Sequence, residues 1–311
     1  MELNVDKFDM PFKILGLIVL IAAFLMLATW LGLVKCGTIP YWCDAYEFVL
    51  GAPRVGIVYG DSGLGDPEKL KEQLLLPNGV NAKAVDLIYV DRISLGNLKN
   101  YKLIIVEKAR VLSADQLAMF MDYANQGGRL VWVADSGVER GFGEITDFSD
   151  INELKKFTSN PWFRVKEAET DAYSVIAFDE FLGLRYFGNY CSVKTCNDVN
   201  FMVGTLITEN TGDHPLIFGL KPALEMRISK EKDFAVVKQF ANSSNSNMVW
   251  TLDFHSVIKT DAGDLGRVVP IIATSNTGER VAYYAYPPEY FATEMGYYSV
   301  IKRMYLGMLG K

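Results

Sequence analysis

Histidine and basic charge are both scarce in this chain of 311 residues. Only two histidines are present, His214 and His255, and 31 basic residues stand against 37 acidic ones, for a formal net charge of −6. A nucleic-acid-binding protein needs a basic face for the phosphates, so this balance argues against nucleic acid as the main partner. Two separated histidines among scattered carboxylates give no metal-ligand spacing, and we expect neither a metal nor a cofactor.

Cysteine is limited to four residues in two close pairs, Cys36 with Cys43 and Cys191 with Cys196. No Cys-x-x-Cys spacing occurs, which argues against a zinc ribbon. The pairs instead predict two local disulfides, which form in oxidising compartments. Four reduced thiols in a reducing compartment are the alternative.

One stretch lacks charge altogether: residues 14–34, between Lys13 and Lys35. A helix rises about 1.5 Å per residue, so this stretch matches a hydrocarbon core of roughly 30 Å. A cleaved signal peptide would have an apolar region about half as long. The stretch therefore predicts an uncleaved transmembrane anchor in the lipid bilayer, between a cytoplasmic tail (1–13) and a juxtamembrane linker (35–52).

The orientation of this anchor is predicted from its flanks and from the cysteines. Lys7 and Lys13 give a weak preference for an N-terminus inside, by the positive-inside rule. The expected disulfides favour an oxidising, extracytoplasmic side for the rest of the chain. The sequence thus predicts a single-pass protein of the cell membrane, with the N-terminus inside and the soluble domain outside.

A regular alternation of strands and helices begins after residue 53. The expected strands cover 54–59, 84–90, 102–106 and 129–134, and the expected helices cover 67–75 and 114–125. Short, continuous apolar strands separated by helices indicate a parallel sheet with right-handed crossovers. We therefore predict a mostly parallel, doubly wound (flavodoxin-like) α/β sheet with helices on both faces, formed by residues 53–311 as one domain.

The later part of this domain is less regular. Residues 144–212 are expected to hold short helices and an insertion with the second cysteine pair. Strands are expected at 235–239, 248–252 and 280–285, and a closing helix at 290–309. Residues 268–273 fit either a helix or a strand.

Five short motifs follow one another along this domain: 59–63 (YGDSG), 112–117 (LSADQL), 123–128 (YANQGG), 213–219 (DHPLIFG) and 278–285 (GERVAYYA). Their order resembles that of the class I glutamine amidotransferase-like superfamily, and the fourth motif resembles a segment of its extracytoplasmic, membrane-linked members. The likeness covers most of residues 53–311. Each motif is unspecific by itself, and their order carries the resemblance.

The resemblance also implies where catalytic residues would lie. Enzymes of this superfamily use a nucleophilic Cys on a sharp turn after a strand, with a His and a Glu from later in the chain. The corresponding turn here, 134–137 (ADSG), has no Cys, and in 286–289 (YPPE) Pro287 stands in the His position. The resemblance therefore implies a degenerate member, a pseudoenzyme.

Some chemistry could still reside at the carboxyl ends of the strands, where open α/β sheets bind ligands. Ser136 could act as a nucleophile with His255 as base and Asp135 beside it; the alternative is an ordinary turn and an unrelated histidine. The glycine-rich loop after the first strand lacks the P-loop Lys, so we expect a turn at the rim of any pocket. The ligand-binding candidates are Gly60, Asp61, Ser62, Gly63, Asp135, Ser136, Tyr286 and Glu289.

The function predicted from these observations is a non-catalytic, membrane-anchored binding or scaffold subunit of an envelope or membrane complex. Its partners would be other membrane or envelope proteins, or a glycan. The alternative is a cell-surface serine hydrolase that uses Ser136 and His255.

Overall fold

The computed structural model describes the chain in sections: residues 6–30, 33–34, 39, 42, 45–46, 49, 51, 53–76, 79–80, 82, 84–141, 160–167, 173–196, 198–208, 214–240, 246–260, 263–275 and 279–310. The chain divides into two compact units. The first comprises Met1–Ala52 with Gly310–Lys311, and the second comprises Pro53–Leu309.

The first unit contains one long helix, α1 (Asp6–Trp30), in the region where the sequence predicted a transmembrane span. In the part of the chain that the structure describes, no helix has both the length and the apolar character needed to cross a membrane. The uncharged part of α1 begins after Lys13, and the described helix reaches Trp30, whereas the span was predicted over 14–34. The predicted transmembrane helix is therefore not supported, nor are the bilayer contact and the single-pass location derived from it.

The second unit is built on a nine-stranded sheet with the order β11-β10-β13-β14-β15-β5-β3-β1-β2. One half is parallel and comprises β2 (Ala84–Tyr89), β1 (Arg54–Tyr59), β3 (Leu103–Val106), β5 (Arg129–Val133) and β15 (Val281–Tyr284). The other half is antiparallel and comprises β14 (Gly263–Ser275), β13 (Ser246–Thr260), β10 (Phe201–Thr208) and β11 (Ala223–Ile228). The α/β class is as expected, but the sheet is mixed where a mostly parallel one was predicted.

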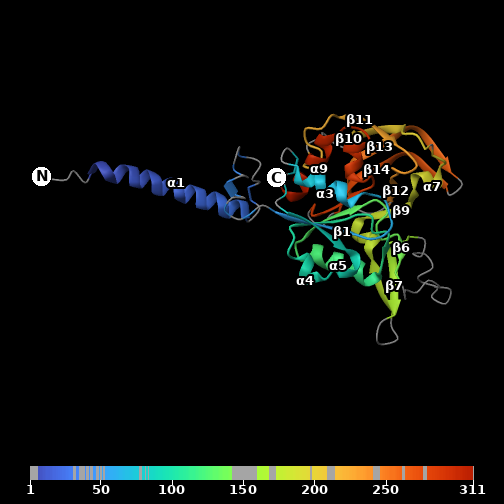
Figure 1. The fold of residues 1–311 in the computed structure, drawn as a ribbon, viewed down its shortest axis with the longest axis horizontal. Coiled ribbons are helices and arrows are strands. Elements are labelled where there is room, and N and C mark those ends of the chain that lie inside the picture. The colour runs from blue at the N-terminus through green and yellow to red at the C-terminus, as the bar shows by residue number, and fades with distance from the viewer. Residues whose placement is uncertain are drawn as a thin grey trace. The chain divides into compact units, whose positions relative to one another are not determined.

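Helices cover both faces of the parallel half (Figure 1). On one face, α3 (Pro67–Leu75) packs on β1 and β2 and contacts α8 (Pro288–Thr293), which contacts α9 (Tyr298–Leu309). On the other, α5 (Ala114–Asn125) packs on β5 and contacts α4 (Leu95–Leu98) and α6 (Phe178–Leu182). All four residues of β3 are buried, as expected of a central strand with both faces covered.

Local sequence signals explain where these helices begin. Asp66 caps α3, with Pro67 in its first turn. At α5, the Ser113 hydroxyl accepts a hydrogen bond from Gln116 N, and the Gln116 side chain accepts one from Ser113 N. This reciprocal capping box satisfies two backbone donors that the helix leaves unpaired.

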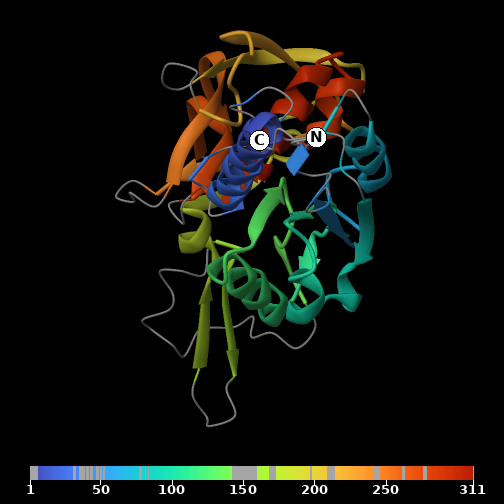
Figure 2. The same cartoon turned by 90° about the vertical axis from the view of Figure 1, so that its left-hand side faces the viewer.

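The remaining elements are short. They are η2 (Val90–Arg92), α7 (Tyr190–Val193) and three two-stranded sheets: β4 (Val111–Leu112) with β6 (Glu139–Arg140), β7 (Phe163–Glu167) with β8 (Tyr173–Ala177), and β9 (Leu184–Asn189) with β12 (Ala235–Gln239). The β7–β8 hairpin extends away from the large sheet (Figures 1 and 2). In the described part of residues 144–212, the expected short helices are α6 and α7, and the strands β7, β8, β9 and β10 between and beside them were not predicted.

Two details of the C-terminal region differ from the sequence-based expectation. Residues 268–273, left open between helix and strand, belong to β14. The single closing helix expected over 290–309 is divided into α8 and α9. Gly296 lies between them with a φ of 69°, a left-handed conformation that ends a helix and that glycine adopts without steric cost.

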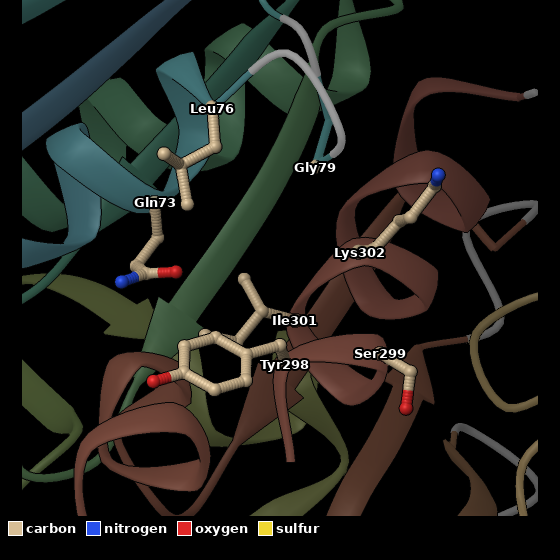
Figure 3. Close-up of a pocket in the computed structure, with 7 residues that line it drawn as sticks. All are labelled: Gln73, Leu76, Gly79, Tyr298, Ser299, Ile301 and Lys302. Atoms are coloured by element: carbon tan, nitrogen blue, oxygen red, sulfur yellow. The ribbon is translucent and has the colours of Figure 1, made fainter. Parts of the chain in front are cut away.

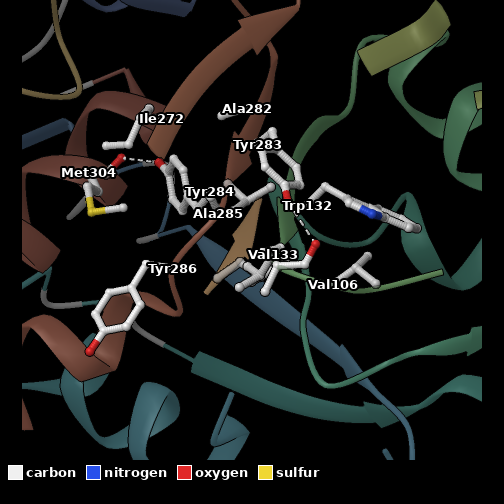
Figure 4. Close-up of a cluster of buried hydrophobic side chains, with 14 of the residues drawn as sticks. Val106, Trp132, Val133, Ile272, Ala282, Tyr283, Tyr284, Ala285, Tyr286 and Met304 are labelled. Carbon is white, nitrogen blue, oxygen red and sulfur yellow. Dashed lines mark hydrogen bonds between the residues drawn. The ribbon is translucent and has the colours of Figure 1, made fainter. Parts of the chain in front are cut away.

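The tyrosine-rich end of the chain forms core structure (Figure 4). Tyr283, Tyr284 and Tyr286 are all buried. The Tyr283 hydroxyl donates to Ala134 O, and the Tyr284 hydroxyl donates to Met304 O. These side chains therefore join the last strand to its neighbours, with each buried hydroxyl satisfied by a backbone carbonyl.

Candidate functional site

The strand order creates a switch point between β1 and β3. From β1 the chain passes through α3 to β2 on one side, and β3 then pairs with β1 on the other side. Open α/β sheets bind ligands outside the carboxyl ends of the strands at such a point. The segments that lie there are the loop after β1 (60–66), the segment after β3 (107–110) and the turn after β5 (134–138).

Backbone hydrogen bonds join these three segments into a continuous rim. Gly60 N donates to Lys108 O at 3.1 Å, and Arg110 N donates to Ser62 O at 2.9 Å. Gly137 N donates to Ala109 O at 2.8 Å. The rim thus continues the sheet past the ends of its strands.

Asp135 is the centre of a buried network at this rim. Its Oδ1 accepts a hydrogen bond from Leu64 N at 2.8 Å. Its Oδ2 accepts from Arg110 Nη1 at 2.9 Å and from Asn189 Nδ2 at 3.0 Å. The carboxylate is therefore held by three donors from three separate segments, as a buried charge requires.

A second buried group of carboxyls lies beside this network. Glu107 directly follows β3, Glu289 lies in the first turn of α8, and neither side chain is exposed to solvent. Burial raises the pKa of Glu107 well above its usual value, and the nearby Glu289 raises it further. Burial likewise raises the pKa of Glu289 to about 8. The pair therefore retains a proton near neutral pH.

The loop after β1 binds side chains of the protein itself. Leu64 N donates to Asp135, Gly65 N donates to the Tyr290 hydroxyl at 3.2 Å, and Asp66 N donates to Glu289 Oε1 at 2.8 Å. In a phosphate-binding loop such N–H groups point at the ligand. Here two carboxyl groups and a hydroxyl take that place, so these donors are not available to a phosphate.

Of the predicted ligand-binding residues in this loop, two face outward and Gly63 packs against the neighbouring segment. Asp61 and Ser62 are exposed, and Asp61 accepts a hydrogen bond from the Tyr89 hydroxyl at 2.7 Å. This bond raises the pKa of Tyr89 to about 12. Gly63, with a φ of 122°, packs against Lys108, where an added Cβ would lie 3.1 Å from the Lys108 Cα.

The turn after β5 holds no exposed nucleophile. Ala134 has a φ of 50°, a left-handed conformation that is costly for a non-glycine residue. Ser136 is buried, and its hydroxyl donates to Val106 O at 3.3 Å. The Ser136 carbonyl accepts hydrogen bonds from the indoles of Trp132 and Trp162, both at 2.9 Å. Ser136 therefore takes part in the packing of the turn.

Neither histidine is hydrogen bonded to Ser136. His255 is an exposed residue of β13, and its Nε2 lies 3.0 Å from the Thr205 hydroxyl. The other histidine, His214, accepts from Leu216 N through Nδ1, and its Nε2 lies 3.6 Å from Glu279 Oε1. The structure thus brings Asp135 together with Ser136 in one turn and joins His255 to a different part of the sheet.

Tyr286 and the second cysteine pair complete the predicted residues. The buried Tyr286 directs its hydroxyl to Arg227 O at 3.3 Å. Cys191 and Cys196 form a disulfide with a Cα–Cα distance of 5.1 Å. Cys36 and Cys43 lie outside the described residues.

A further buried carboxyl, Asp233, anchors the disulfide segment. It accepts hydrogen bonds from Cys191 N and Phe234 N, at 2.9 and 2.8 Å. Burial raises the pKa of Asp233 to about 7. Asn189, just before α7, connects the same segment to Asp135.

Sequence reasoning missed three residues of the site: Glu107, Arg110 and Asn189. Glu107 and Arg110 directly follow the predicted strand 102–106, so their place at the carboxyl end of a parallel strand was a usable signal. Asn189 has no such signal, because it comes from the small β9–β12 sheet. Within the residues that the structure describes, no group of three or more His, Cys, Asp and Glu residues is placed to hold a metal ion.

A separate cavity of about 450 Å³ lies between the end of α3 and the beginning of α9 (Figure 3). Its walls include Leu76, Ile301 and the exposed Tyr298, together with the polar residues Gln73, Ser299 and Lys302. Its volume is within the range of small-molecule sites, and its lining is mainly apolar.

The fold places the chain in a known structural class. The sheet and its helices form a class I glutamine amidotransferase-like fold, the fold of ThuA-like proteins. Among solved structures, the chain is similar to a putative ThuA-like protein from Bacteroides uniformis. The TM-score is 0.54 and the identity 15%, over 83% of this chain and 92% of that chain. A likeness at this identity shows the fold alone.

Two other solved structures are less similar. A putative ThuA-like protein from Parabacteroides merdae has a TM-score of 0.44 and 13% identity, over 84% of this chain and 91% of that chain. A cold-adapted β-galactosidase from Rahnella has a TM-score of 0.45 and 15% identity, over 81% of this chain but 33% of that chain. No protein-family model and no curated protein matches the chain.

Proposed function

We propose that this protein is a non-catalytic binding or scaffold protein, a degenerate member of the amidotransferase-like class. The single observation that carries the proposal is the turn after β5. Its non-glycine residue in the left-handed conformation is Ala134, whose methyl group cannot act as a nucleophile, and the nearby Ser136 hydroxyl is buried and bonded to Val106 O.

The rest of the rim supports the same conclusion. An enzyme of the cysteine or serine type needs a nucleophile and a base within hydrogen-bond reach. Asp135 is instead saturated by donors from Leu64, Arg110 and Asn189. At this rim an enzyme would have catalytic residues. In this protein the residues there instead hold three loops together.

The ligand class proposed is a glycan or a partner protein. The cavity between α3 and α9 supports a glycan, because its lining combines the exposed Tyr298 with the polar residues Gln73, Ser299 and Lys302. A sugar stacks its apolar face on a tyrosine ring and directs its hydroxyl groups to the polar side chains. A partner protein would use the exposed aromatic residue in a similar way, as an anchor at an interface.

Hydrolysis and binding assays on the full chain test this proposal. The protein and its Ser136→Ala variant are compared on a panel of ester and amide substrates, with His255→Ala as the matched control for the alternative base. We expect no turnover above the uncatalysed rate in any of the three. Turnover by the wild type that is lost in Ser136→Ala would refute the proposal. Saturable binding on a glycan array, or a stoichiometric complex fixed by chemical cross-linking, is the positive result expected.

A further inference from the structure

The buried pair Glu107–Glu289 has oxygen atoms that no donor satisfies. Among the described residues, no donor hydrogen bonds in good geometry to Glu107 Oε1, Glu107 Oε2 or Glu289 Oε2. The two carboxyl groups lie against consecutive residues of one loop, Glu107 against Gly65 and Glu289 against Asp66 N, and Glu289 adds to burial in raising the pKa of Glu107. Two ionised carboxylates have only acceptors, so a hydrogen bond between them requires a proton on one of them.

The loop 60–66 lies directly over this pair. A Cβ added to Gly65 would come within 2.4 Å of Glu107 Oε1, so the backbone of the loop covers the Glu107 side chain. Asp66 N donates to Glu289 Oε1, and Gly65 N donates to the neighbouring Tyr290 hydroxyl. The loop, the end of β3 and the first turn of α8 therefore meet at these two carboxyl groups.

We propose that Glu107 and Glu289 share one proton and that this proton locks the loop 60–66 over the carboxyl ends of β1 and β3. When the proton passes to a base in solution, the pair becomes two carboxylates, and the hydrogen bond from Asp66 N to Glu289 Oε1 is the only one that the described residues donate to them in good geometry. Their repulsion, in a site closed to water, favours a state in which the loop lifts and admits solvent. The closure of the loop 60–66 over the switch point between β1 and β3 therefore depends on pH.

The other charged and titratable side chains around the pair do not supply the missing donor. Asp66 and Lys69 face it from the start of α3, Tyr286 and Tyr290 from around the start of α8, and Tyr305 from α9, while Lys108 follows Glu107 on its own segment. The Lys69 ammonium is paired with Asp66 at 3.0 Å. The Tyr305 hydroxyl is itself buried without a partner among the described residues.

Hydrogen exchange of the loop 60–66 in the full chain, at pH 6 to 10, tests the lock. Rates are corrected for the intrinsic pH dependence of amide exchange. In the wild type we expect protection to fall by up to about tenfold per pH unit as the pH rises towards about 8, the value to which burial raises the pKa of Glu289, because opening exposes a carboxyl group that then gives up its proton. Above this pH the closed state has lost the proton as well, and protection should stay constant.

The substitution Glu289→Gln removes the shared proton. The side-chain oxygen of the new glutamine still accepts from Asp66 N, and its side-chain NH2 group donates to Glu107. We expect its loop protection not to fall with pH. Asp233→Asn is the matched control, because Asp233 is also a buried carboxyl but contacts Cys191 and Phe234. It should keep the wild-type fall. Flat protection in the wild type, or an equal fall in Glu289→Gln, would overturn the proposal.

A spectroscopic readout covers the case in which Glu289→Gln does not fold. The infrared band of a protonated carboxyl should be present in the wild type at pH 6 and weaken above a pH of about 8. Glu107→Gln, which neutralises the other member of the pair, should also lose the pH-dependent fall in loop protection. A band that does not change over this range would contradict the shared proton.

Discussion

Asp135 shows how one residue can hold several loops in place. Its carboxylate is almost fully buried and accepts hydrogen bonds from a backbone amide, a guanidinium and a side-chain amide. A buried charge with this many donors is stable, whereas a donor left without its acceptor costs free energy. The residue that sequence reasoning considered for a catalytic role is thus explained by its structural contacts.

Asp135→Ala should strongly destabilise the protein. The change leaves the Leu64, Arg110 and Asn189 donors without their acceptor, and we expect a loss of about 3 to 5 kcal/mol in the free energy of unfolding. Urea denaturation measures it. Asp86→Ala is the control, because Asp86 pairs with Arg54 at an exposed site and should cost less than about 1 kcal/mol. Equal losses in the two variants would contradict this account of the network.

At the scale of elements, the loop between β1 and α3 is shaped by close contact. Gly65 has a φ of 118° and lies against Glu107, and Gly63 has a φ of 122° and lies against Lys108. From the sequence, this glycine-rich loop was predicted to be a turn at the rim of any pocket. The structure adds the reason for its glycines, which is that the backbone packs tightly on the segment after β3.

Gly65→Ala tests this reading of the loop. The added methyl group meets Glu107 at 2.4 Å and forces a left-handed backbone on alanine. We expect a loss of about 2 kcal/mol or more in the free energy of unfolding, measured by urea denaturation. Gly96→Ala in α4 is the matched control, since no atom lies within 4 Å of its added Cβ and alanine favours a helix. The prediction fails if Gly65→Ala is tolerated as well as Gly96→Ala.

At the scale of the whole molecule, buried carboxyls connect folding to pH. The folded protein holds protons on Asp233 and Glu289 at pH values where an unfolded chain has lost them, because burial raises both pKa values. The folded state therefore binds more protons than the unfolded state between a pH of about 4 and the folded pKa values. By linkage, the free energy of unfolding falls as the pH rises through this window.

Asp233→Asn should reduce this pH dependence. Burial raises the pKa of Asp233 to about 7, so its contribution is fully present below a pH of about 4 and is lost by pH 7. In the variant, the fall in the free energy of unfolding between pH 4 and 7 should be smaller by up to about 4 kcal/mol. Chemical denaturation at several pH values measures the slope. An unchanged slope would show that Asp233 does not hold its proton in the folded state.

Local patterns in the sequence predicted much of the parallel half of the sheet. The strands that contain Ile57, Ile105 and Val131 and the helices after Asp66 and Ser113 were all expected, because apolar runs, caps and helix periodicity act over a few residues. The antiparallel half was expected in fragments only. The long hairpin of β13 and β14 includes exposed and polar positions, so its apolar segments alone did not reveal its length.

The sequence by itself determined the α/β class and the absence of a cysteine nucleophile after the fourth predicted strand, since both are read from neighbouring residues. Only the tertiary structure decided which polar groups meet at the carboxyl ends of the strands. Asp66 and Glu289 are 223 positions apart, and Leu64 and Asp135 are 71 apart. Such pairs depend on the order of strands in the sheet and on the burial that this order creates, and neither property is encoded in a short stretch of chain.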